Sequence, residues 1–342
     1  MDILGIDVSK SKFDVALLRD NEYVLATFDN DSVGFVKLRK WLKNREVNEL
    51  HACLEATGRY GDDLALYLHE VGYRVSIANP ARVQAYAVSQ LKRNKTDRED
   101  AKLIAHFCAT QEPELWTPPS RAQQELQAMV RHLESIQTMR QQESNRLQAG
   151  VPSIAVRETL EAPIAVLDEQ INHLPQRIRD HIDQHPDLKQ QKDLLTSIPG
   201  IADVTATKLL AEIPSLERFQ GASQLAAYAG LTPRQHQSGS SVFRRGRMAK
   251  TGNAHLRRAL YMPALVALRW NPIIRVFADR LRERGKHKMV IIGAVMRKLL
   301  HIVYGVLNSG MPFDPSYAAN VQDSACLLYT SPSPRDISAY LV

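Results

Sequence analysis

A short apolar run near the start of the chain contains a single acid, and it limits the folds that the chain can adopt. Residues 3–8 read Ile-Leu-Gly-Ile-Asp-Val, a pattern typical of a buried β-strand. A buried carboxylate costs free energy unless a cation or hydrogen-bond donors pair with it. The strand therefore predicts that Asp7 faces a charged site. Three acids further along, Glu55, Asp97 and Asp100, are candidates to share that site.

The segments that follow alternate between strand patterns and helix patterns. Phe13–Leu18 and Tyr23–Phe28 read as two more strands, each preceded by a polar turn. Ser32 is a candidate cap for a helix over residues 33–42. The order βββ-α-β-α-β-α is completed by a strand at 51–55, a helix at 62–71, a strand at 74–78, a helix opening at Pro80 and a helix over 97–108.

This order places the four acids where they can form a metal site for phosphodiester chemistry. Asp97 and Asp100 are three residues apart on the expected helix and so lie on one face of it, whereas Glu99 points to another face. Carboxylates that converge repel each other and raise their own pKa values. Hard cations such as Mg²⁺ remove that penalty by taking oxygen ligands, and two ions about 3.5–4 Å apart can stabilise both the attacking and the leaving oxygen.

Simpler roles for the same acids remain open at this point. Asp7 can serve in a turn or as a cap, and Glu55 can be a strand-end acid that faces water. Asp97 and Asp100 can compensate the dipole at a helix N-terminus.

The middle of the chain, residues 119–190, has apolar residues at three- and four-residue steps with Gln, Arg and Glu between them. This coiled-coil-like pattern predicts two long helices with a break at residues 150–153. Pro163 and Pro175 argue against one uninterrupted second helix. The pair of helices can be either a dimerisation arm or a hairpin packed within its own chain.

The C-terminal part contains a possible phosphate-binding turn. Ile198-Pro199-Gly200-Ile201 precedes a helix expected over 204–213 and is similar to a helix-hairpin-helix element. In such an element the turn at Gly200 and the helix N-terminus offer backbone N–H groups to a phosphate. An ordinary helix-capping turn is the alternative.

Residues 218–278 contain no Asp or Glu, although the chain has 37 acids in total. Together with the net charge of +7, this absence predicts a phosphate-binding surface. A small loop, Ser238-Gly239-Ser240-Ser241, lies inside the segment. The basic residues of the segment are Arg218, Arg234, Arg244, Arg245, Arg247, Lys250, Arg257, Arg258, Arg269 and Arg275.

The 342 residues allow two domains and a connector, which we place at 1–115, 191–320 and 116–190. No apolar run reaches eighteen residues, the N-terminus reads directly into a strand without a signal peptide, and the three cysteines lack metal-ligand spacing. These features predict a cytoplasmic protein without a membrane span. Cys326–Asp336 resembles the translation of a sequencing adapter, so we expect residues 326–342 to be a non-native tail.

The order of elements resembles the α/β fold of RNase H-like nucleases, and the acids make the resemblance more specific. In the RuvC branch, an Asp on the first strand, a Glu on the fourth and two Asp three apart on a late helix bind two metal ions. Asp7, Glu55, Asp97 and Asp100 match that pattern in order.

A wider set of motifs over about residues 1–318 closely resembles the DEDD transposases of the insertion-sequence-110 family, the bridge-RNA-guided recombinases. The motifs that carry the resemblance are Leu4-Gly5-Ile6-Asp7, Glu55-Ala56-Thr57-Gly58, Asn94-Lys95-Thr96-Asp97 with Asp100, Ile198-Pro199-Gly200-Ile201, Tyr228-Ala229-Gly230-Leu231-Thr232-Pro233 and Leu256-Arg257-Arg258-Ala259-Leu260-Tyr261.

The resemblance implies a RuvC-like domain, a coiled coil and a mainly helical transposase domain with a catalytic serine, which by position is Ser238. It also implies two Mg²⁺ ions per site, a covalent phosphoserine–DNA intermediate, and a non-coding RNA that pairs with donor and target DNA. A tetramer made of two dimers is the expected assembly, in the bacterial cytoplasm at the nucleoid. Two rivals remain: a RuvC-like structure-specific endonuclease that uses water as nucleophile, and a non-catalytic nucleic-acid-binding scaffold.

Overall fold

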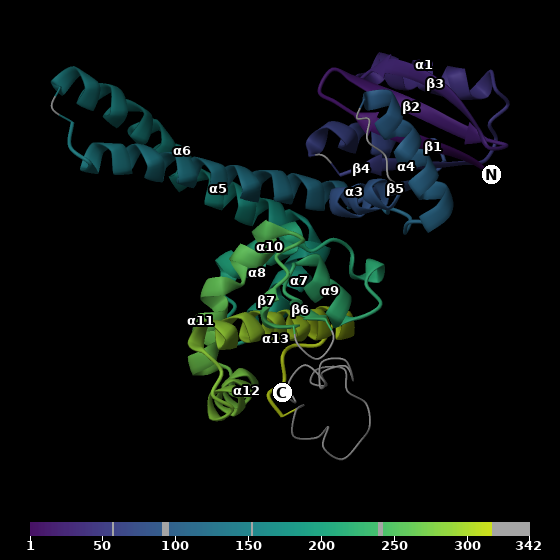
Figure 1. Cartoon of the computed structure of the whole chain (residues 1–342). Helices are drawn as coiled ribbons and strands as arrows, with labels where there is room; N and C mark the ends of the chain where they lie inside the picture. The colour runs from purple at the N-terminus through teal and green to yellow at the C-terminus, as the bar shows by residue number, and fades with distance from the viewer. Residues whose placement is uncertain (57, 91–95, 152, 239–241, 317–342) are drawn as a thin grey trace. The chain divides into compact units, whose positions relative to one another are not determined.

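Two compact units make up the chain, residues 1–118 and 119–342. The computed structural model describes residues 1–56, 58–90, 96–151, 153–238 and 242–316 (Figure 1), and for residues 59, 235–238 and 242–247 it describes the backbone only. Each unit has its own hydrophobic core. The finer division at residues 115, 190 and 320 stays a prediction.

A five-stranded mixed sheet forms the centre of the first unit, in the order β3-β2-β1-β4-β5. The first three strands are antiparallel, and β1, β4 and β5 are parallel. Asp20 and Asn21, both with positive φ, form the tight turn between β2 and β3. The predicted strands are confirmed as β1 (Asp2–Val8), β2 (Lys12–Arg19), β3 (Glu22–Asp29), β4 (Leu50–Glu55) and β5 (Arg74–Ala78).

Side chains of each strand alternate between two covered faces. Leu4, Ile6 and Val8 pack in the core that includes apolar residues of α1 and α2. Asp7 projects from the other face, which is covered by apolar residues of α3 and α4. The helices are α1 (Ser32–Lys43), α2 (Asp62–Glu70), α3 (Pro80–Ser89) and α4 (Asp97–Gln111), with a 3₁₀ turn, η1, at Arg59–Gly61.

A close approach between β1 and α4 fixes the helix against the strand that carries Asp7. A Cβ added to Gly5 would lie 2.2 Å from both the Ala101 carbonyl oxygen and the Ala105 nitrogen. Only glycine permits this approach. Because Asp97 and Asp100 lie in the turn just before Ala101, the contact holds both acids near β1.

The predicted cap of the first helix is wrong by one residue. Asp31, not Ser32, is the N-cap: its backbone is extended and its carboxylate accepts the Gly34 N–H at 2.7 Å. Ser32 is already helical. Asp and Ser are equally good caps, so the sequence alone does not choose between neighbours.

The second unit begins with two long helices that run antiparallel along each other (Figure 1), α5 (Arg121–Gln148) and α6 (Ile154–Gln184). Arg140 and Asp168 form an ion pair between them, with Nε and Oδ1 2.9 Å apart. The prediction that Pro163 and Pro175 interrupt the second helix is wrong, since α6 runs through both. Its packing along α5 outweighs the loss of one backbone hydrogen bond at each proline. The dimerising coiled coil stays a prediction.

The rest of the second unit is mainly helical around α13, which supplies much of the core. Of the helices within the described residues, α13 is long and apolar enough to cross a membrane, but 61% of its apolar stretch is buried inside the unit, as in the core helix of a globular domain. The expected helix over 204–213 is confirmed as α8. The elements are α7 (Pro186–Thr196), α8 (Asp203–Glu212), η2 (Leu216–Arg218), α9 (Ala222–Tyr228), β6 (Pro233–Ser238), β7 (Val242–Met248), α10 (Ala254–Ala259), α11 (Tyr261–Trp270), α12 (Pro272–Glu283) and α13 (Lys288–Ser309).

The first unit is therefore a mixed α/β domain whose five-stranded sheet and flanking helices are consistent with the expected RNase H-like fold. The second unit is mainly α, as expected. The turn Ile198–Ile201 lies between α7 and α8, where a helix-hairpin-helix turn would lie, and its phosphate-binding role stays a prediction.

Candidate functional site

The four predicted acids come together around Asp7. Asp7 lies in β1, Glu55 is the last residue of the adjacent strand β4, and Asp97 and Asp100 occupy the first turn of α4. Burial, followed by the neighbouring charges of Asp100, Asp97 and Glu55, raises the pKa of Asp7 to about 6. The side chains are therefore close enough to repel one another, although they come from three separate elements.

A fifth carboxylate, Asp14, belongs to the same cluster and was missed by the sequence reasoning. It lies directly opposite Asp7 in the β1–β2 pairing, is only 4% exposed, and accepts a hydrogen bond from Thr27 Oγ1 at 2.5 Å. Its charge also contributes to the raised pKa of Asp7. The available signal was the hairpin itself: a polar turn at residues 9–11 pairs position 7 with position 14.

A lysine bridges two of these carboxylates. Lys12 Nζ lies 3.0 Å from Asp97 Oδ2 and 3.3 Å from Asp14 Oδ2, so it joins the start of β2 to the start of α4. Its hydrogen bond to Asp97 is the main reason that the pKa of Asp97 lies below, and that of Lys12 above, the usual value. No sequence pattern pointed to a role for Lys12.

The chemistry of the cluster fits a divalent metal ion. Carboxylate oxygens are the ligands that Mg²⁺ prefers, and the mutual repulsion felt by Asp7 is the penalty that a bound cation removes. Within the described residues, no three His, Cys, Asp or Glu side chains already have the spacing of a formed metal site. Glu99 Oε1 accepts from Lys102 Nζ at 2.7 Å, in keeping with the expectation that it is not a ligand.

The predicted nucleophile, Ser238, is the last residue of β6 in a two-stranded hairpin with β7. Its side chain and residues 239–241 lie outside the described part of the chain. The base of the hairpin is held by hydrogen bonds from the Lys250 nitrogen to the Gly230 oxygen at 3.1 Å and from the Ala249 nitrogen to the Thr232 oxygen at 2.9 Å. The Tyr228–Pro233 motif thus forms the support of the hairpin.

The predicted nucleic-acid-binding residues fall on several elements of the second unit. Arg234 and Lys250 are exposed at the base of the hairpin, and Arg244, Arg245 and Arg247 lie on β7, where only the backbone is described.

The other three predicted contacts have structural partners. Arg257 Nη1 donates to the Ala229 oxygen at 3.0 Å, and the exposed Arg258 has Nη2 3.3 Å from His255 Nδ1. A Cβ on Gly200, whose φ is +106°, would lie 2.9 Å from the Ala267 Cβ. Arg257 and Gly200 therefore have packing roles whether or not they touch a phosphate.

A buried ionic network supports the helices beneath these residues. Glu212, on α8, is 3% exposed and accepts from Arg131 Nε at 2.7 Å and Arg131 Nη2 at 2.8 Å. Asn253 Nδ2 also donates to Glu212 at 2.8 Å, while Asn253 Oδ1 caps α10 by accepting the Leu256 N–H. The network links α5 and α8 to α10, which carries Arg257 and Arg258. Nothing in the sequence signals a pair 81 residues apart.

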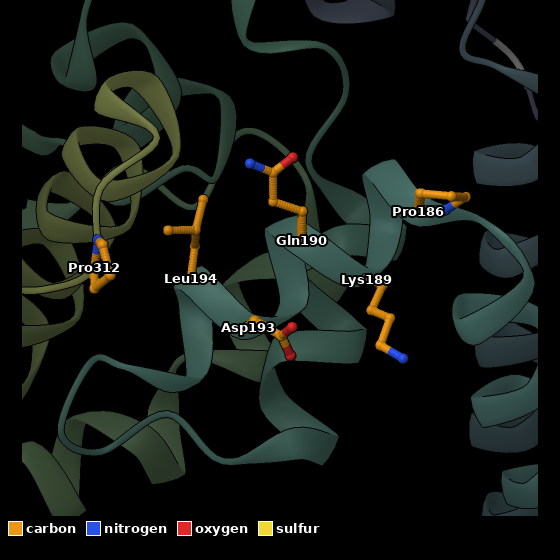
Figure 2. A pocket seen from close by; sticks show the side chains of 6 residues that line it. All are labelled: Pro186, Lys189, Gln190, Asp193, Leu194 and Pro312. Carbon is orange, nitrogen blue, oxygen red and sulfur yellow. The ribbon is translucent and has the colours of Figure 1, made fainter.

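An open hollow of about 380 Å³ lies on α7 (Figure 2). It contains none of the predicted site residues. Its lining is Pro186, Lys189, Gln190, Asp193, Leu194 and Pro312.

Both units of the chain match models of transposase families. Residues 4–155 match the model of the IS110 DEDD transposases, and residues 192–279 match the model described as the transposase IS116/IS110/IS902 family. The first match contains Asp7, Glu55, Asp97 and Asp100, and the second contains the β6–β7 hairpin with Ser238.

Individual proteins agree with the family matches. The chain is 38% identical over 314 residues to the pilin gene-inverting protein of Moraxella lacunata, covering 91% of this chain and 97% of that protein. It is 26% identical over 294 residues to the transposase for insertion sequence element IS1111A of Coxiella burnetii, covering 78% of each. A similar match, 25% identical over 284 residues, covers 73% of this chain and 81% of the IS1328 transposase of Yersinia enterocolitica.

Proposed function

Because the chain belongs to the IS110 family of transposases, we propose that its four carboxylates bind divalent metal ions and that this site cuts and rejoins the ends of a mobile element. The observation that carries the proposal is the placement of acids from β1, β4 and α4 around Asp7. Burial first, and then the charges of these neighbours, raise the pKa of Asp7, and a bound cation would offset both costs. In a non-catalytic scaffold that binds no metal ion, this repulsion would stay uncompensated.

Asp7, Glu55, Asp97 and Asp100 are the residues that would hold the ions, with Mg²⁺ as the expected metal. The metal supplies Lewis-acid stabilisation of the scissile phosphate and of the attacking and leaving oxygens. Asp14 keeps its place behind Asp7 through its hydrogen bond with Thr27, and it adds negative charge that favours a dication over a monovalent ion.

Ser238 is proposed as the nucleophile. Its Oγ attacks the scissile phosphorus and loses its proton to solvent; the bond from phosphorus to the leaving deoxyribose oxygen breaks, and that oxygen takes up a proton. A second DNA hydroxyl then attacks the phosphoserine, rejoins the strand and releases the serine. The place of Ser238 at the end of a hairpin whose second strand carries three arginines supports this role.

The name of the Moraxella relative also favours a covalent intermediate over hydrolysis. An inverted gene is cut and rejoined without free ends, and a phosphoserine link keeps the energy of the broken bond for rejoining. Hydrolysis by water is the alternative, since the DEDD carboxylates alone can activate water.

Target choice is proposed to rest on a non-coding RNA that pairs with donor and target DNA. The acid-free segment 218–278 supplies backbone contacts without a base-reading motif, which suits a protein that leaves sequence reading to base pairing. Assembly as a dimer, and as a tetramer of two dimers on DNA, belongs to the same proposal.

The test uses purified protein, RNA from the non-coding end of the element, labelled donor and target DNA, and Mg²⁺. The wild type is expected to form a protein–DNA adduct that survives a denaturing gel, and Ser238→Ala and Asp7→Asn are expected to lose it. Omitting the RNA should abolish cutting. Cutting without an adduct, unchanged in Ser238→Ala, would replace the serine by water; no cutting by the wild type with its own element ends would overturn the proposal.

A further inference from the structure

We infer that the Lys12 ammonium group acts as a counter-cation within the carboxylate cluster. It holds Asp97 in the metal-free protein, and a divalent metal ion displaces it from Asp97 on binding. The inference rests on the metal site proposed above and adds a positioning residue to it. Lys12 belongs to β2, whereas Asp97 belongs to α4, so the contact joins two elements 85 residues apart in sequence.

The two carboxylates that Lys12 contacts are held very differently. The side chain of Asp14 is 6% exposed and is fixed by Thr27 Oγ1. The side chain of Asp97 is 58% exposed at the first position of α4, where Thr96 is the cap. Asp14 therefore anchors the ammonium group of Lys12, and Lys12 in turn positions the freer carboxylate of Asp97.

This arrangement opposes metal binding at Asp97. The Lys12 ammonium lies 3.0 Å from Asp97 Oδ2 and so takes one of the two carboxylate oxygens that Asp97 offers to a metal ion. A dication bound beside Asp97 would also be repelled by the positive charge of Lys12. Metal binding must therefore break the Lys12–Asp97 contact or bear its repulsion, so Lys12 lowers the metal affinity.

Lys12 also stabilises the metal-free protein. Without a metal ion, five carboxylates lie near one another, and a cation between two of them reduces their repulsion. It keeps the first turn of α4 beside β2, with Asp97 already close to the position from which it can bind an ion. Lys12 thus lowers the affinity of the site for metal and orders the site in the metal-free protein.

The experiment measures Mn²⁺ binding by electron paramagnetic resonance on the full chain without DNA, together with the melting temperature in EDTA. Lys12→Met is expected to bind Mn²⁺ on the order of tenfold more tightly than the wild type, while melting at a lower temperature in EDTA. Lys12→Arg, which keeps the charge, should restore both values. Lys10→Met is the matched control, because Lys10 is exposed two residues away and its loss changes the net charge equally.

The outcomes separate the inference from the proposed function. Mn²⁺ binding that requires Asp7 but is unchanged or weaker in Lys12→Met would overturn the role of Lys12 and leave the metal site intact. Equal tightening in Lys10→Met would reduce the effect to net charge and also overturn it. Absence of any binding that depends on Asp7 would overturn the metal site, and the inference with it.

Discussion

Replacing Asp7 by Asn is expected to make the metal-free protein more stable at pH 7.5. The pKa of Asp7 rises from 3.8 to about 6 on folding, which corresponds to about 3 kcal/mol at 1.36 kcal/mol per unit. Asp7 is only partly buried, so solvent screening reduces this to about 1–2 kcal/mol. Asn has similar shape and no charge, and it removes the repulsion.

The pH dependence has a definite sign. Because the folded pKa is raised, the folded state binds more protons than the unfolded state between pH 3.8 and about 6, so Asp7 costs stability as the pH rises through that window. The advantage of Asp7→Asn is therefore full at pH 7.5, roughly half as large at pH 5, and absent well below pH 3.8.

Thermal unfolding in EDTA measures the effect, followed by the fluorescence of Trp41 and Trp116, which pack on the core of the first unit. We expect the melting temperature to rise by about 3–8 °C in Asp7→Asn. Mg²⁺ should raise that of the wild type and leave the variant nearly unchanged. Asp63→Asn, an exposed acid on α2, is the matched control and should change little. An Asp7→Asn protein no more stable than wild type at pH 7.5, or one whose advantage grows at pH 5, would refute the reasoning.

Three further outcomes are expected. Gly5→Ala should destabilise the first unit by about 3 kcal/mol or more and weaken Mn²⁺ binding, because the added Cβ pushes α4 away from β1; a soluble variant with wild-type melting would contradict the close packing. Glu212→Ala should cost about 1–3 kcal/mol in urea unfolding, since it removes the buried acceptor shared by Arg131 and Asn253; a loss below 1 kcal/mol would show the network to be dispensable. Arg234→Ala should weaken binding to all DNA sequences alike and reduce the salt slope by about 1, and a sequence-selective loss would contradict a phosphate contact.

Most of the first unit follows from local sequence patterns. Short apolar runs, separated by the polar turns before Phe13 and Tyr23, predict the three-stranded meander that the structure contains. Asp7 was recognisable because an acid inside a buried strand is unusual. Asp97 and Asp100 were recognisable because two acids three residues apart lie on one face of a helix. What they do for one another, the raised pKa of Asp7, needs the fold.

The parts that sequence reasoning missed depend on contacts between distant residues. Asp14 and Lys12 are ordinary strand residues until the hairpin register places one opposite Asp7 and α4 brings Asp97 to the other. The continuity of α6 through Pro163 depends on a neighbouring helix that a single-helix rule does not consider.

The site of Ser238 could be inferred only from the resemblance to a family. Physical chemistry alone does not separate it from Ser240 or Ser241, which follow within three residues.

The rate of DNA strand cleavage in Mg²⁺ by single variants of α4 and β4 tests the proposed metal site. We expect Glu55→Gln, Asp97→Asn and Asp100→Asn each to lose activity by at least about a hundredfold, because each removes a proposed metal ligand. Glu99→Gln, on the same turn of α4 but paired with Lys102, should keep it. Cleavage that survives the loss of Asp97 and Asp100 but not of Glu99 would contradict the proposed metal site.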